Sequence, residues 1–197
     1  MREELSRAQA SLVKQDPAPY FFGYTVTDVD AAQLSASNGA LESVNRNRAR
    51  WLDVSVRVGS YDLDNTHQVP GESGVAPFIL PRRGPYDDGD AVLRRALWRA
   101  TDRTYKDAAR QYLRVKTAKD VRVAAEDTSH DFARTGTQEG EEQPATLGAG
   151  LERHITRWKD SLRVWSEAFR REAHILNSHV TLTARAETTY KIGRAHV

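Results

Sequence analysis

The chain has 197 residues, 39% of them hydrophobic and 28% charged, with a formal net charge of +2 from 29 basic and 27 acidic residues. This composition is typical of a folded globular protein, and the near balance of charge argues against a dedicated nucleic-acid-binding protein. The absence of cysteine excludes disulfides and thiolate metal sites within the chain, and no apolar run approaches the roughly 20 residues of a membrane-spanning helix.

The first predicted elements are a short helix and a strand. Leu5, Ala8 and Leu12 fall on one face of a helix over residues 2–15, and the prolines that follow it stop the helix. Residues 20–29 are rich in Tyr, Phe, Thr and Val, which predicts a strand. The chain begins without an apolar segment of the kind found in signal peptides, so we expect a cytoplasmic protein with no membrane contact.

Residues 32–58 predict a hairpin followed by a very regular strand. Asn38-Gly39 is a strong two-residue turn signal between two arms with alternating side chains. Residues 51–58 alternate apolar and polar side chains with a period of two, the pattern of a half-buried strand. We therefore expect three or four consecutive strands joined by short turns, an antiparallel meander.

The middle of the chain predicts a loop, a helix and a second loop. Prolines and glycines break any regular pattern in residues 66–85. Apolar side chains at helical spacing predict a long helix over residues 87–116, with Asp87 or Asp88 as its N-cap. Residues 117–150 lose this periodicity and include a polar, acidic stretch, which predicts a long mobile surface loop.

The clearest helical pattern lies over residues 151–171, where apolar residues recur every three or four positions: Leu151, Ile155, Trp158, Leu162, Trp165 and Phe169. We interpret the three aromatic residues as core and not as a cofactor site. Residues 179–190 alternate again and predict a last strand. The expected fold class is α+β: a mixed, largely antiparallel sheet, formed by the meander and the late strand, packed by two long helices and a short N-terminal helix.

Histidines are the first candidates for chemistry. None of the six stands in a recognised metal-ligand spacing such as His-Glu-x-x-His. We therefore expect surface or boundary histidines. They are His67, His130, His154, His174, His179 and His196.

Asp62, Asp64 and Asn65 are the second candidate group, directly after the regular strand. Paired carboxylates can bind a metal or act as a general base. The same residues also suit a strand end held by a turn, and the sequence favours this structural interpretation because no histidine lies among them.

A basic arm is the third candidate, formed by Arg46, Arg48 and Arg50 with Trp51 beside them. Arginines could bind phosphates while the tryptophan stacks on a base. A solvated strand face or a subunit contact is the favoured alternative, because acidic residues lie nearby at positions 42 and 53. From the residues alone no catalytic or metal-binding residue is assigned, and substrate-binding residues stay unknown.

Four segments form a series of motifs along the chain. They are Pro19-Tyr20-Phe21-x-x-Tyr24-x-Val26-x-Asp28, Ala36-Ser37-x-Gly39-Ala40-Leu41, Leu52-Asp53-Val54-x-Val56-Arg57-Val58-Gly59-x-Tyr61-x-Leu63-Asp64-Asn65-Thr66 and Asp90-Ala91-x-Leu93-Arg94-Arg95-Ala96-Leu97-Trp98-x-Ala100-Thr101-Asp102-x-x-Tyr105-Lys106. With the later helix and strand, this series resembles the N-terminal region of the TldD/PmbA family of metallopeptidases over nearly all of residues 2–190.

The resemblance implies a two-domain zinc peptidase in which this chain is the non-catalytic N-terminal domain. The family's zinc motif, His-Glu-x-x-x-His, and a further ligand, commonly cysteine, belong to the C-terminal domain, and no residue here matches them. The resemblance thus implies zinc in the missing domain, a peptide substrate, and a homo- or hetero-dimer with a related subunit. A non-enzymatic partner subunit or binding module of the same fold is the alternative.

Residues 191–197, Lys-Ile-Gly-Arg-Ala-His-Val, resemble the translated read-through of a common sequencing adapter. We therefore expect one incomplete domain over residues 1–190 and a non-native tail after it. If the chain is a fragment, exposed apolar surface is expected around Val180, Leu182 and Tyr190, where a second domain would dock.

Overall fold

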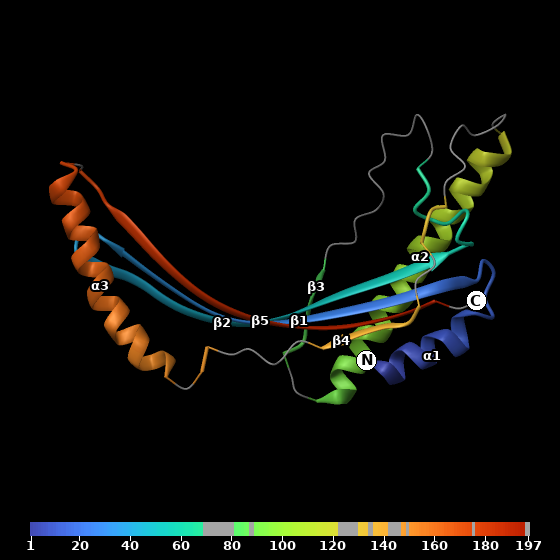
Figure 1. The fold of residues 1–197 in the computed structure, drawn as a ribbon, viewed down its shortest axis with the longest axis horizontal. Coiled ribbons are helices and arrows are strands. Elements are labelled where there is room, and N and C mark those ends of the chain that lie inside the picture. The colour runs from blue at the N-terminus through green and yellow to red at the C-terminus, as the bar shows by residue number, and fades with distance from the viewer. Residues whose placement is uncertain are drawn as a thin grey trace. The chain divides into compact units, whose positions relative to one another are not determined.

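The computed structural model describes residues 1–68, 81–86, 89–121, 130–133, 136–141, 147–148, 150–174 and 176–195. The elements in chain order are α1 (Arg2–Leu12), β1 (Pro19–Ser37), β2 (Ala40–Val58), β3 (Arg82–Gly84), α2 (Asp90–Val121), β4 (Gln138–Glu141), α3 (Leu151–Glu172) and β5 (His179–Ala195) (Figure 1). The described strands form one antiparallel sheet in the order β3-β2-β1-β5-β4, which confirms the α+β class.

The N-terminal part of the sheet is simpler than the meander that we expected, because two strands of 19 residues each replace three or four short ones. Asn38-Gly39 forms the predicted turn, with φ angles of 50° and 81° that suit these two residue types. No further turn interrupts β1 or β2. The polar stretch of β2 stays in the strand because its arginines find carboxylates on β1, as described below.

The structure corrects the expectation of a loop throughout residues 117–150 at two places. α2 continues to Val121, since extending an existing helix costs far less than starting one. β4 pairs antiparallel with β5, with Gln138 opposite Gly193 and Glu141 opposite Tyr190. Backbone pairing with β5 places β4 in the sheet, and its sequence, Gln-Glu-Gly-Glu, has no apolar pattern from which a strand could be predicted. The predicted N-cap residues 87 and 88 lie outside the described residues, as do residues 69–80, within the predicted loop over residues 66–85.

The chain divides into two compact units. Unit 1 comprises Met1–Val26, Trp51–Glu141 and Thr189–Val197, and unit 2 comprises Thr27–Arg50 and Glu142–Thr188. β1, β2 and β5 contribute residues to both. Each unit has a hydrophobic core of its own. The one domain that we expected over residues 1–190 therefore contains two hydrophobic cores.

The core of unit 1 lies between the sheet and the helices α1 and α2. Alternate residues of the two long strands point into it, and α2 covers them with residues at helical spacing. Its buried members are Leu5, Ala8, Phe22, Tyr24, Val26, Leu52, Val54, Val56, Val58, Leu97, Tyr105, Ala108 and Ile192. Ile192 shows that β5 does not end at Tyr190, as we expected, but contributes to this core; the adapter-like character of residues 191–197 stays a prediction.

The core of unit 2 is smaller and lies between β1 and α3. Ala32, Leu34 and Ala36 of β1 are buried with Leu151, Ile155 and Leu162 of α3. Val180 and Leu182 of β5 are half-buried and pack against this cluster. The exposed apolar surface that we expected around these two residues is therefore not found there; exposed apolar side chains lie on other elements, among them Trp165 and Phe169 of α3.

Candidate functional site

The acidic end of β2 folds back on itself in unit 1. Gly59 and Asp64 form a bridge, and the amide of Asn65 donates to the carbonyl of Val58 over 3.1 Å. Gly59 has a φ of 113°, and a Cβ atom there would lie 2.5 Å from the carbonyl oxygen of Leu63 and from the ring of Tyr112. Only glycine fits this position, and the tight turn directs the carboxylate of Asp64 inward.

Asp64 is completely buried and its carboxylate is saturated with hydrogen bonds. Oδ1 accepts from the backbone amide and the hydroxyl of Thr66, over 2.6 and 2.7 Å. Oδ2 accepts from the Tyr20 hydroxyl and from Nη1 of Arg57, each over 2.7 Å. A carboxylate has about four acceptor sites, and all four are occupied here. Asp64 thus has no lone pair left for a metal or a substrate proton.

The pKa values in this cluster follow from the same contacts. Burial alone would raise the pKa of Asp64, but the hydrogen bonds from Thr66, Tyr20 and Arg57 outweigh it and lower that pKa below its usual value. Burial and the bond to Asp64 both raise the pKa of Tyr20. The carboxylate is therefore held ionised and the phenol neutral, the opposite of what a proton-transferring pair requires.

The other candidate acid and the asparagine also have structural partners. Asp62 is largely exposed and lies 2.6 Å from Nδ1 of His130. Asn65 accepts through its side-chain oxygen from the amide of Val58 over 2.8 Å. The sequence missed Asp131, which accepts from the Asp64 amide over 2.8 Å and lies 2.7 Å from Nδ1 of His67. No spacing signal links residue 131 to this turn.

Aromatic rings close the cluster from one side. The guanidinium carbon of Arg57 lies 4.0 Å from the ring centre of Phe132, and this ring stacks on Tyr61 at 6.3 Å. Phe132 also meets Phe21 edge-on at 4.9 Å. Arg57 is thus held by a carboxylate and by a ring face together, which fixes it as a structural residue.

The basic arm lies in unit 2, except for Trp51, which belongs to unit 1. Arg50 forms a two-bond ion pair with Asp28, over 2.6 and 2.7 Å. Arg46 and Arg48 lie 3.5 and 3.7 Å from the buried Asp30. Arg46 also lies 3.6 Å from Glu152, so the three arginines face three carboxylates and the arm has no net charge. This pairing favours the interpretation as a strand face over a phosphate-binding site.

Replacing Arg50 by alanine is expected to lower the stability of unit 2 by about 1.5–3 kcal/mol, because it leaves the half-buried Asp28 without its partner. Replacing Arg48, which is half exposed and only near Asp30, should cost less than about 1 kcal/mol. Urea unfolding of both variants and the parent protein measures the difference. Equal losses of stability in the two variants would contradict the larger contribution that we expect from the two hydrogen bonds of Arg50 to Asp28.

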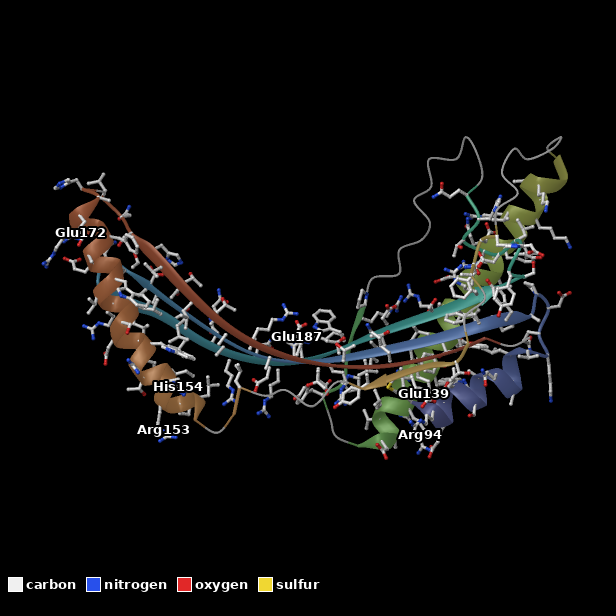
Figure 2. The ribbon with its side chains drawn as sticks, in the orientation of Figure 1. Arg94, Glu139, Arg153, His154, Glu172 and Glu187 are labelled. Atoms are coloured by element: carbon white, nitrogen blue, oxygen red, sulfur yellow. The ribbon has the colours of Figure 1, made fainter. Side chains whose placement is uncertain are left out.

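The remaining histidines lie apart from one another. His154 stacks on Trp158 with ring centres 5.5 Å apart and projects, like Arg153, from the first turn of α3 (Figure 2). His179 lies 3.1 Å from Glu42, and His174 follows α3 with a φ of 50°. Position 196 is outside the described residues. Across the part of the chain that the structure describes, no group of three or more potential ligands could hold a metal ion.

Trp165 and Phe169 contradict the prediction that they belong to the core. Their exposed fractions are 50% and 57%, whereas Leu162 in the same seam is fully buried. The buried face of α3 passes through Leu162 and Ser166, and the Ser166 hydroxyl accepts from the amide of Gly39 at the hairpin turn over 2.9 Å. Trp165 and Phe169 lie beside this face and not on it, which is why they stay exposed.

Comparisons with protein-family models, with curated proteins and with solved structures gave no match to this chain. None of the described helices is long and apolar enough to cross a membrane.

Proposed function

We propose that this chain is a non-catalytic α+β domain of a TldD/PmbA-like zinc metallopeptidase that acts on peptides. In this proposal the zinc motif, His-Glu-x-x-x-His, belongs to a separate domain of the protein. The saturated carboxylate of Asp64 is the observation that carries the non-catalytic role. The sequence resemblance supplies the class of enzyme.

The places of the motifs in the fold support this proposal. The segment of residues 36–41 forms the hairpin turn, and the segment of residues 52–66 forms the end of β2 and the turn that buries Asp64. The segment of residues 90–106 lies in α2, whose Thr101 hydroxyl lies 2.9 Å from that of the buried Tyr24. The motifs thus coincide with structural turns and packing contacts, as expected of a scaffold.

Exposed apolar side chains on α3 support a role inside a larger assembly. Val164, Trp165 and Phe169 are each at least half exposed, and aromatic side chains of this size are enriched where proteins bind one another. A covering catalytic domain or a related subunit in a dimer would bury them. The proposal also keeps the cytoplasmic location expected from the sequence, which cell fractionation would test.

The test is the activity of a longer reading frame that contains this chain. We expect it to encode His-Glu-x-x-x-His and to hydrolyse unstructured peptides, and a metal chelator should abolish the hydrolysis. The chain alone and a variant with both motif histidines replaced by alanine are the matched controls, and both should be inactive.

A reading frame without the motif and without hydrolysis would contradict the peptidase proposal. It would favour the alternative of a non-enzymatic partner subunit with the same fold. Hydrolysis that survives in the chain alone would contradict the non-catalytic role of this domain.

A further inference from the structure

The solvent side of α2 in unit 1 carries a row of arginines. Arg95, Arg99 and Arg103 follow one another at intervals of four residues, so they lie on one side of the helix. All three are exposed, whereas Leu97 and Ala108 on the other side of α2 are buried in the core. This Arg95–Arg103 row spans about 12 Å along the helix axis and is accessible to a partner.

No ion pair joins the row to a described residue. The ion pairs that α2 forms with described residues belong to Arg94, Lys106 and Arg110. Asp102, the carboxylate next to the row in the sequence, lies 2.7 Å from Lys106. Like charges four residues apart destabilise a helix, so the row costs the fold stability that an anionic partner would restore.

Trp98 adds an apolar contact beside the row. It lies three residues after Arg95, which makes the two side chains neighbours on the helix surface. Its side chain is 46% exposed. Tryptophan and arginine are among the residue types that contribute most to binding energy at protein interfaces. The row and Trp98 together therefore have the composition of a protein-binding surface.

The charges around the row favour an acidic protein segment over a nucleic acid. Asp102 and Asp107 stand within four residues of Arg103, are partly exposed and pair with Lys106 and Arg110. A nucleic acid carries a phosphate at every nucleotide and would meet these carboxylates, and the whole chain has a net charge of only +2. A helix with glutamate at every fourth position presents carboxylates at the same spacing as the row.

We propose that the Arg95–Arg103 row and Trp98 bind an acidic helical segment of a partner protein, with successive carboxylates on the three arginines and an apolar side chain on Trp98. The ion pairs set the register and the rate of association, and the contact with Trp98 buries apolar surface. The proposal does not depend on the assignment to a metallopeptidase.

The experiment measures binding of a fluorescein-labelled peptide, four repeats of Glu-Ala-Ala-Leu, to the whole chain by fluorescence anisotropy. We expect saturable binding at about 50 mM salt that weakens roughly tenfold at about 300 mM, because salt screens exposed charges. The same peptide with lysine in place of glutamate should not bind. No saturation up to about 1 mM, or equal binding of the lysine peptide, would overturn the proposal.

The matched variants are Arg99→Glu and Lys116→Glu, both at exposed positions of α2, of which only the first lies in the row. Arg99→Glu should weaken binding by about tenfold, and Trp98→Ala by about fivefold. Arg99→Glu should not lower the melting temperature, since it removes two like-charge contacts within the helix. Lys116→Glu should bind as the parent protein does. Equal affinities of the two charge variants would contradict the proposed surface.

An oligothymidine and vesicles that contain phosphatidylserine test the other anionic partners in the same assay. Both should bind more weakly than the glutamate peptide. Tighter binding of either one, with its loss in Arg99→Glu, would overturn the assignment of the row to a protein partner.

Discussion

Replacing Asp64 by alanine is expected to destabilise unit 1 by about 3–5 kcal/mol, because the change leaves Arg57 without its buried partner. The hydroxyl of Tyr20 and the amide of Thr66 lose their acceptor at the same time. Asp62→Ala is the matched control two residues away, where the side chain is 72% exposed, and it should cost less than about 0.5 kcal/mol. Urea unfolding followed by tryptophan fluorescence gives both values.

The loss in Asp64→Ala should depend on pH in a defined direction. The folded state lowers the pKa of Asp64, so this carboxylate contributes stability above its unfolded-state pKa of about 3.9. That contribution is lost as the pH falls through the lower folded-state pKa. The stability difference between the parent protein and the variant should therefore be constant near neutral pH and shrink below about pH 4. A difference that grows in acid would contradict the hydrogen-bonded, ionised state of Asp64.

Replacing Leu162 by alanine is expected to destabilise unit 2 by about 2–5 kcal/mol, because the side chain is fully buried against β1 and its loss leaves a cavity. Trp165 lies one helical turn later in the same apolar seam and is larger, yet half of it is exposed. Trp165→Ala should cost about 1 kcal/mol or less.

Thermal unfolding of the two variants by circular dichroism compares them directly. The order of the two costs is the informative result, since residue size alone would predict the reverse. A loss for Trp165→Ala equal to that for Leu162→Ala would place this tryptophan in the core, as its spacing in the sequence suggests, and would remove the exposed seam that supports the proposed assembly.

Sequence patterns predicted the secondary structure well where neighbouring residues determine it. The Asn38-Gly39 turn and the helix of α3 follow from residue type and spacing. The extent of β1 and β2 did not, because charge pairing across the hairpin keeps their polar stretches in the sheet. The ion pair of Asp28 and Arg50 is one example of this pairing.

The candidate site could be predicted only in part. The structural role of Asp64 was favoured from its neighbours, but its partners Tyr20 and Asp131 come from distant positions that no spacing rule connects. The exposure of Trp165 and Phe169 depends on which face of α3 meets the hairpin, which is a property of the tertiary packing. The apolar spacing of a helix identifies a seam but not which part of that seam its partner covers.

The zinc content of a longer protein that contains this chain tests the central claim most directly. Elemental analysis after dialysis should give one zinc per molecule for that protein and none for the chain of 197 residues. Alanine at the two motif histidines should remove the metal without unfolding this domain. Tightly bound zinc in the chain alone, or a longer protein without zinc, would contradict the account of a non-catalytic domain joined to a zinc peptidase.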